Sequence, residues 1–276
     1  MFQSVVYALK TNPTGQALFD SLGLTQLSRF WPYILLSALF FHVLSILSDP
    51  LSHLIFGAAY AKLPKHKRHS WGIRVASHAH AIFTILASIP IFNSPPLVED
   101  RVFGYTDYAS MVYSVVCGYF LWDLFLCITE FQSYGLGFLF HAISALSVYI
   151  QGFRPCLQYY GPRFLMLELT TIPLNHHWFM EKLDIGGVLP IVNGVTLAVL
   201  YFAVRVVYST YISYCVFLDL AAVGDLVPTW LHYIYRISNV TSCLLNYFWF
   251  YKLVLGFYRR VATMGGGKQQ SKAKLQ

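Results

Sequence analysis

The stretch LELTTIPLNHHWFMEKL, residues 167–183, puts strongly polar side chains into a segment that is otherwise apolar. Glu168, Thr171, Asn175 and Trp178 follow one another at intervals of three, four and three residues. On an α-helix this spacing places the four side chains on one face. Because an unpaired polar group in hydrocarbon costs several kcal/mol, that face must be turned toward other protein segments or a cavity. The stretch therefore predicts a helix packed inside a bundle of membrane helices.

The composition of the whole chain is typical of an integral membrane protein. Hydrophobic residues make up 57% of the 276 residues and charged residues 11%, whereas soluble domains contain about 25% charged residues. A chain of this length can form six or seven helical spans of roughly 20 residues each. The apolar runs are too long and too uniform for the strands of a membrane barrel. We therefore expect an all-α multi-pass membrane protein.

Seven apolar segments are predicted to form transmembrane helices. Their approximate bounds are 30–49, 72–92, 108–130, 134–151, 162–181, 188–216 and 229–257. The first segment does not follow directly on a charged start, so we expect no cleavable signal peptide. The five cysteines are scattered and form no CxxC pair, so neither a zinc site nor a disulfide framework is expected.

Loop charges predict the orientation of these helices. The loop after the first segment and the C-terminal tail are both basic, which marks them as cytosolic. The basic residues are Lys62, Lys65, Lys67, Arg68 and Arg74 near the loop, and Arg259, Arg260, Lys268, Lys272 and Lys274 in the tail. We attribute the net charge of +7 to these flanks, which face anionic lipid, and expect no nucleic-acid partner.

The loops expected on the lumenal side are acidic. They contain Glu99, Asp100 and Asp107, and Asp219 and Asp225. Seven helices with a lumenal N-terminus and a cytosolic C-terminus satisfy both patterns. Arg154 and Arg163 are exceptions, because they fall in a short loop on the lumenal side.

The last five residues, 272–276, read KAKLQ and fit a KxKxx retrieval signal. A COPI-type coat reads such a signal on a cytosolic tail and returns membrane proteins to the endoplasmic reticulum. We therefore predict a multi-pass protein of the endoplasmic reticulum membrane. The alternative is a basic tail that is simply held by anionic lipid.

Polar residues from five segments are expected to gather in the cytosolic half of the membrane. A rise of about 1.5 Å per residue puts one group roughly 10 Å below the cytosolic surface and another roughly 13–20 Å below it. The first group is His78, His80, Asp123, His141 and Asn175, and the second is Glu168, Thr171 and Asn246. Their similar depths suggest one shared polar site.

Each of these residues also has a purely structural interpretation. His141 can be a hydrogen-bonding residue of the helix packing, and Asp123 either pairs with a histidine or stays protonated. His78 and His80 diverge by about 200° on a helix, so at most one points inward and they do not form a metal-binding pair. The adjacent residues 176 and 177, both histidines, are expected at the cytosolic interface.

The motifs of the chain resemble the TLC-domain family, especially its branch of TLC-domain-containing proteins. The matching pieces are Ser77-His78-Ala79-His80, Gly118-Tyr119-Phe120-Leu121-Trp122-Asp123, Phe140-His141, the run from Glu168 to Asn175 with Trp178, and Leu245-Asn246-Tyr247-Phe248-Trp249 with Lys252. They occur in the family order over residues 68–260. Residues 1–67 would then hold the first helix and the basic loop, and residues 261–276 the cytosolic tail.

The resemblance implies six helices forming a barrel around a cavity that opens to the cytosol and accepts an acyl chain. Ceramide synthases of this family make sphingolipids with adjacent histidines followed by paired aspartates. Here Phe140 precedes His141, and only Glu168 lies near the place of the aspartates. The chain therefore resembles the TLC-domain-containing branch rather than a true ceramide synthase.

Three functions remain open from the sequence. The first is lipid homeostasis, in which the cavity binds or senses a lipid or acyl chain without chemistry and holds no bound cofactor. The second is a lipid acyltransferase with acyl-CoA as co-substrate, entering past the basic residues 62–74. The third is a trafficking or cargo receptor between the endoplasmic reticulum and the Golgi.

The acyltransferase alternative assigns roles to particular residues. His141 would act as base or nucleophile, oriented by Asp123 or Glu168, and Asn175 or Thr171 would steady the oxyanion. The side chains expected to bind the lipid or line the cavity are His78, His80, Tyr119, Thr171, Asn175, Trp178, Asn246 and Trp249.

Overall fold

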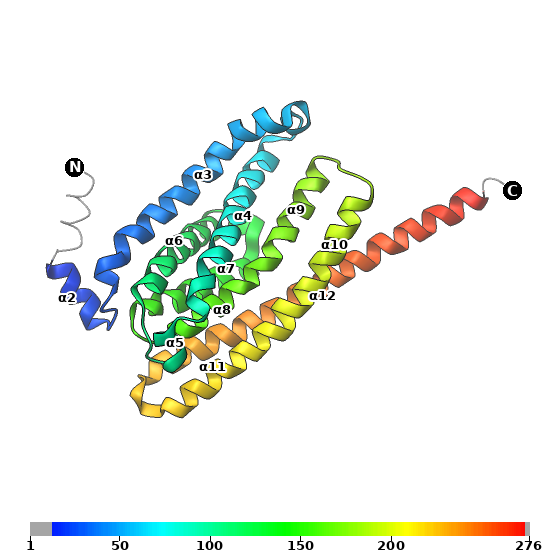
Figure 1. Ribbon diagram of the computed structural model, residues 1–276. Helices are drawn as coiled ribbons and strands as arrows, with labels where there is room; N and C mark the ends of the chain where they lie inside the picture. The colour runs from blue at the N-terminus through cyan, green and yellow to red at the C-terminus, as the bar shows by residue number, and fades with distance from the viewer. Residues whose placement is uncertain (1–12, 274–276) are drawn as a thin grey trace.

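The computed structural model describes residues 13–273, with side chains from residue 16 to residue 259. The described part consists of helices and contains no strand (Figure 1). The longer elements in chain order are α2 (Pro13–Ser21), α3 (Leu27–Ala61), α4 (Lys65–Phe92), α5 (Pro95–Glu99), α6 (Asp107–Thr129), α7 (Phe131–Tyr149), α8 (Gly161–Leu165), α9 (Thr171–Lys182), α10 (Val188–Leu200), α11 (Ser209–Val223) and α12 (Thr229–Ala273). The predicted retrieval signal at 272–276 lies outside the residues whose side chains are described.

Within the described residues, six helices are long and apolar enough to cross a membrane. They cover Leu27–Ala61, Lys65–Phe92, Asp107–Thr129, Phe131–Phe153, Val188–Leu226 and Thr229–Arg259. These correspond to six of the seven predicted segments, and they confirm an all-α multi-pass membrane protein. The remaining predicted segment, 162–181, is helical as well but is interrupted.

The interrupted pass consists of α8, the 3-10 helix η3 (Met166–Thr170) and α9. Pro173 lies in the first turn of α9 and has no N–H to donate to the turn before it. The chain therefore changes from the tighter 3-10 form to the α form just ahead of the proline. The pass runs beside α4 and α10 inside the bundle (Figure 1).

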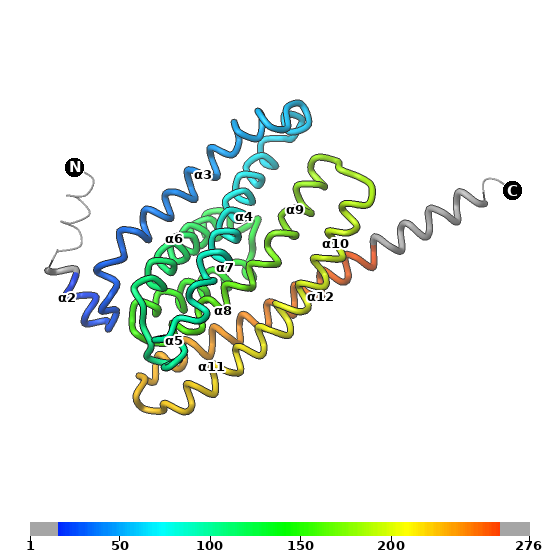
Figure 2. Tube along the Cα trace, viewed as in Figure 1, coloured from blue at the N-terminus to red at the C-terminus, as the bar shows by residue number. Residues whose placement is uncertain are grey.

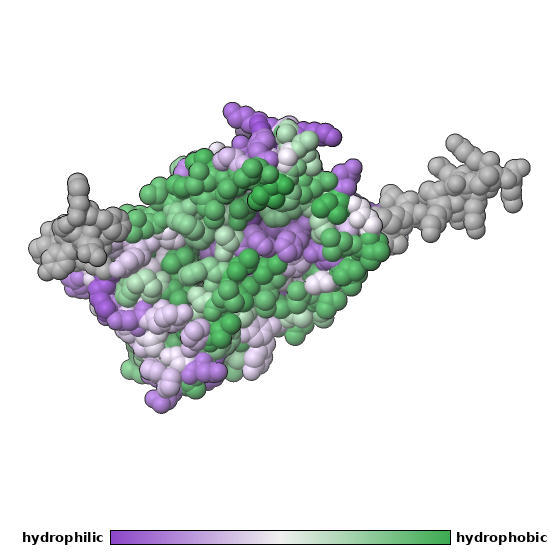
Figure 3. All heavy atoms as spheres, turned by 45° about the horizontal axis from the view of Figure 1, so that its top comes forward, coloured by the Kyte–Doolittle hydropathy of each residue, from purple (hydrophilic) through white to green (hydrophobic). Residues whose placement is uncertain are grey.

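The two ends of the bundle differ in charge. The α3–α4 and α9–α10 connections lie at one end, and α5 and the α11–α12 turn lie at the other (Figure 1). The trace in Figure 2 shows α12 returning beside α10 and α11 from that turn. Hydrophobic side chains form a broad band between more hydrophilic ends (Figure 3). We call the end that carries the exposed Lys62 and Lys65 the basic end.

Three arginines at the opposite end have close partners. Arg101 pairs with Asp219 at 2.7 Å. Arg154 donates to the backbone carbonyl of Leu22, and Arg163 lies 3.3 Å from the centre of the Tyr159 ring. The two arginines that break the predicted charge pattern are therefore used in local contacts, unlike the exposed lysines of the basic end.

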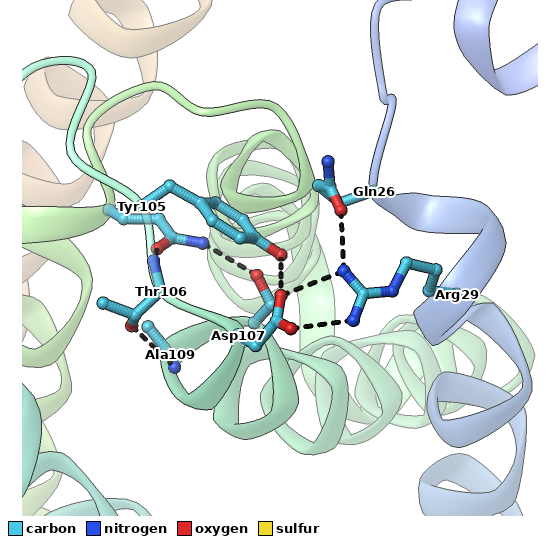
Figure 4. A network of polar contacts seen from close by, with 8 residues as sticks. Gln26, Arg29, Tyr105, Thr106, Asp107 and Ala109 are labelled. Atoms are coloured by element: carbon cyan, nitrogen blue, oxygen red, sulfur yellow. Dashed lines mark hydrogen bonds and ion pairs between the residues drawn. The ribbon is translucent and has the colours of Figure 1, made fainter.

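Arg29 and Asp107 join the starts of α3 and α6 at the same end (Figure 4). The guanidinium donates to both carboxylate oxygens, at 3.1 and 2.7 Å. The Tyr105 hydroxyl donates to Asp107 Oδ1 at 2.9 Å, and burial raises the pKa of Tyr105 to about 12, so this phenol stays protonated. Thr106 caps α6 by accepting from the backbone N–H of Ala109 at 3.2 Å.

Helices α3, α4 and α6 form the most tightly packed part of the molecule, which we call the packed sector. A Cβ added at Gly118 of α6 would lie 2.4 Å from the carbonyl oxygen of Ile34, and one added at Gly72 of α4 would lie 2.2 Å from that of Ser45. Both glycines thus let a neighbouring backbone approach closely, as small residues do between membrane helices. Helix α6 is central in the bundle. Of its most apolar stretch of 18 residues, 56% are buried, compared with 6% of the corresponding stretch of α12.

Candidate functional site

A cavity lies on the other side of α6 from α3. It encloses about 660 Å³ of empty space, part of which is open to the surroundings. Its lining comes chiefly from α7, α8, η3, the π-helix η4 (Tyr201–Tyr208) and α12, which we call the cavity sector. The lining residues are Phe120, His141, Ser144, Ala145, Val148, Tyr149, Phe164, Leu165, Leu167, Glu168, Arg205, Ser238, Asn239 and Ser242.

Two of the three predicted catalytic residues line this cavity. His141 comes from α7 and Glu168 from η3. The imidazole of His141 stands edge-on to the rings of Phe120 and Trp249, at centroid distances of 6.2 and 5.6 Å. The predicted Trp249 thus supports His141 from α12. The third predicted residue, Asp123, lies one turn after Tyr119 on α6 and is not among the residues that line the cavity.

Arg205 is the charged group of this cavity that our sequence analysis missed. Its side chain is 9% exposed, and it lies near the middle of the apolar helix Val188–Leu226. Arg205 Nε donates to Thr170 Oγ1 at 2.6 Å, and its two terminal nitrogens make longer contacts with Asn246 Oδ1 at 3.4 Å and Thr171 Oγ1 at 3.5 Å. An arginine at this depth costs about 2.5–3.5 kcal/mol by insertion scales, so it is expected to face protein or a ligand.

The contacts of Arg205 explain two predicted site residues. Thr171 and Asn246 are buried and lie against the guanidinium rather than on the cavity wall. Asn246 also donates to Ser209 Oγ at 3.4 Å, which links α12 to α11. The signal that could have found Arg205 is its isolation, since it is the one charged residue between Asp184 and Asp219.

The other predicted residues of the opening stretch belong to a separate cluster toward the basic end. Arg74 Nη1 donates to Asn175 Oδ1 at 3.0 Å, and the Arg74 guanidinium carbon lies 4.7 Å from the centre of the Trp178 ring. Arg74 thus turns inward instead of extending the basic loop. Glu168 lies in the 3-10 helix, whose turn is tighter than that of α9, so spacing on an ideal α-helix overstates the shared face.

His80 and Tyr119 are placed in the packed sector. Their rings stack with centroids 3.7 Å apart and an interplanar angle of 10°. His80 is fully buried, and neither of its ring nitrogens has a hydrogen-bond partner among the described residues. His78 lies on another side of α4, with its ring 4.8 Å from that of the exposed His176. The expectation that at most one of the two α4 histidines points inward agrees with these positions.

Comparison with known proteins identifies the family. A model of the TLC domain matches residues 70–255. An uncharacterized TLC domain-containing protein of Schizosaccharomyces pombe is 35% identical over 242 residues, which are 87% of this chain and 83% of that protein. Topoisomerase I damage affected protein 4 of Saccharomyces cerevisiae is 30% identical over 230 residues, covering 80% of this chain and 82% of that protein.

A vertebrate protein is as similar to the chain as the Saccharomyces cerevisiae protein is. TLC domain-containing protein 4-B of Danio rerio is 30% identical over 233 residues, which are 81% of this chain and 88% of that protein. No solved structure matches the chain. Two of these three relatives are named as TLC domain-containing proteins and none of the three as a ceramide synthase, in agreement with the branch that the motifs predicted. The chain belongs to the TLC-domain family.

Proposed function

We propose that this protein acts in lipid homeostasis by binding or sensing a single lipid or acyl chain in the cavity of the cavity sector. The observation that carries the proposal is the cavity itself, which combines apolar walls with the polar groups of His141, Glu168 and Arg205. A chain of methylene groups suits the apolar walls, and a polar head suits the three polar groups.

The proposal places the protein in the endoplasmic reticulum membrane with a cytosolic C-terminus. The charge of the basic end supports this orientation. Lys62 and Lys65 are exposed in the basic loop at the basic end. Lysines and arginines are enriched on the cytosolic side of a membrane.

Native mass spectrometry of the purified full-length protein tests the proposal. We expect a bound lipid that survives purification. Ala145→Phe projects into the cavity and is expected to reduce the bound lipid at least tenfold. Ile143→Phe is the matched control, because Ile143 lies on the same helix but is 43% exposed on its outer face. Equal lipid content in the two variants, or no bound lipid in the unaltered protein, would contradict the proposal.

A second candidate function is acyl transfer, favoured by the presence of His141 and Glu168 in the lining of one cavity. His141 would take the proton of an incoming hydroxyl or amine as that group attacks the thioester carbonyl of acyl-CoA, and CoA would leave as the thiol. Microsomes supplied with labelled acyl-CoA test this function. His141→Ala should abolish transfer while the protein stays folded, and undiminished transfer would exclude His141 as the reactive group.

A further inference from the structure

Arg205 carries a positive charge that the described part of the chain leaves without an ion pair. No described carboxylate oxygen lies within 4.0 Å of its guanidinium nitrogens. Its three hydrogen-bond partners are the neutral oxygens of Thr170, Thr171 and Asn246, and two of these contacts are 3.4 Å or longer. A buried cation normally gains a countercharge, because neutral acceptors compensate only part of its lost hydration.

The guanidinium has capacity for a further partner. An arginine has five N–H groups, and only the contact to Thr170 is short. Glu168 lines the same cavity but is not paired with Arg205 in the arrangement described. Glu168 therefore does not occupy the guanidinium.

The backbone at Arg205 is also unusual. The residue lies inside the π-helix η4, between the regular helices α10 and α11. Wide turns of this kind are rare and often occur at functional sites. Ser209 Oγ donates to the carbonyl of Arg205 at 2.5 Å, so the local hydroxyl supports the backbone while the side chain is directed to the cavity.

From these observations we propose that the cavity selects lipids with an anionic head, and that Arg205 binds the carboxylate or phosphate oxygens of a single-chain lipid. A guanidinium binds two oxygens of such a group at once, through parallel N–H donors. The hydroxyls of Ser144, Ser238 and Ser242 on the cavity wall are available to a head group as neutral donors. The inference rests on the proposed lipid-binding function and adds the charge of the ligand to it.

Competition binding tests the charge preference on the unaltered protein. The full-length protein is reconstituted in nanodiscs of zwitterionic lipid and loaded with radiolabelled oleate. Unlabelled oleate and lysophosphatidate are compared with oleyl alcohol as competitors. We expect at least one anionic lipid to compete at least tenfold better than the alcohol, and the better of the two identifies the head as carboxylate or phosphate. Equal competition by the alcohol would overturn the inference and leave lipid binding intact.

Substitution of Arg205 tests the residue. Arg205→Gln should weaken binding of the preferred anion at least tenfold and change binding of labelled oleyl alcohol less than threefold. Arg29→Gln is the matched control, because it removes an arginine of the opposite end that does not line the cavity. Unchanged anion binding by folded Arg205→Gln would overturn the inference. Absence of both oleate and alcohol binding in the unaltered protein would instead contradict the proposed function, and the inference would fall with it.

Discussion

The packed sector and the cavity sector are built from similar apolar helices but accommodate polar side chains in opposite ways. In the packed sector, His80 is enclosed by aromatic rings, and its nitrogens have no partner among the described residues. In the cavity sector, Arg205 gathers hydroxyl and amide oxygens from two helical segments and reaches an open volume. A buried polar residue alone therefore does not indicate a site, whereas a buried polar residue that adjoins empty space is a candidate for one.

The backbone explains the difference. Glycines in the packed sector bring helices together until no room remains for a Cβ. In the cavity sector, the 3-10 helix η3 and the π-helix η4 replace regular α-helix where the two elements contact each other, and residues of both line the cavity. The first arrangement favours stability, and the second leaves the volume in which we propose that a lipid binds.

The largest expected effect comes from filling a close helix contact. Gly118→Ala should destabilise the protein by about 3 kcal/mol, because the new Cβ would meet the Ile34 backbone and the Cβ of Ser37 at 2.4 Å. Gly137→Ala on α7 is the control, since its nearest neighbour would be 3.8 Å away. Unfolding in detergent micelles gives both values. Equal losses for the two variants would show that the packed sector is no tighter than the cavity sector.

The next largest effect on stability is expected at Thr170, with Thr84 as the control. Thr170→Val removes the oxygen that accepts from Arg205 Nε, and we expect a loss of about 2 kcal/mol because the donor is charged. Thr84→Val in the packed sector removes a hydroxyl bonded only within its own helix, to the carbonyls of His80 and Ala81. That control should change stability by only about 1 kcal/mol or less, because the hydrogen bond it removes is neutral. The same unfolding assay measures the stability of both variants. A larger loss of stability for Thr84→Val than for Thr170→Val would contradict the expectation.

Substitutions of His80 and His141 should separate effects on stability from effects on lipid binding. His80→Phe keeps the ring stack with Tyr119 and removes two unpartnered nitrogens, so we expect a gain of about 1 kcal/mol and unchanged lipid content. His141→Phe should leave stability nearly unchanged and reduce lipid content severalfold, because the imidazole lines the cavity. Melting curves and native mass spectra of both variants check this. Loss of lipid from His80→Phe but not from His141→Phe would show that the lipid binds in the packed sector instead of the cavity sector.

The smallest effect is expected at the exposed ion pair of the opposite end. Arg29→Gln breaks the contact with Asp107, whose side chain is 56% exposed, and should cost less than about 1 kcal/mol. The loss should shrink further in high salt, which melting curves at two ionic strengths measure. A loss as large as that of Gly118→Ala would mean that the ends, rather than the helix contacts, hold the bundle together.

Hydropathy and motif order were sufficient to predict the fold class and the family. Six of the seven predicted segments are apolar helices of spanning length, and the seventh is a helical pass interrupted before Pro173. The pattern could not locate that interruption, because spacing arguments assume a uniform turn of 3.6 residues. The tighter η3 separates Glu168 from the cluster of Asn175 and Trp178.

The site was only partly predictable for a related reason. His141 and Glu168 stand out as polar residues in motifs, and both line the cavity. Arg205 belongs to no quoted motif, and a single charge hardly changes the mean hydropathy of so long an apolar helix. Its role follows from the partners that the tertiary structure supplies, Thr170 from η3 and Asn246 from α12.

Photoaffinity labelling with a diazirine fatty acid tests the central claim most directly. The full-length protein is labelled in nanodiscs with and without excess oleate, and the labelled residues are mapped by mass spectrometry. We predict label that oleate displaces and that is concentrated in the cavity-lining residues of α7, α8, η3 and α12. Label that oleate does not displace, spread over exposed apolar positions such as Leu54 and Ile55 of α3, would contradict the account.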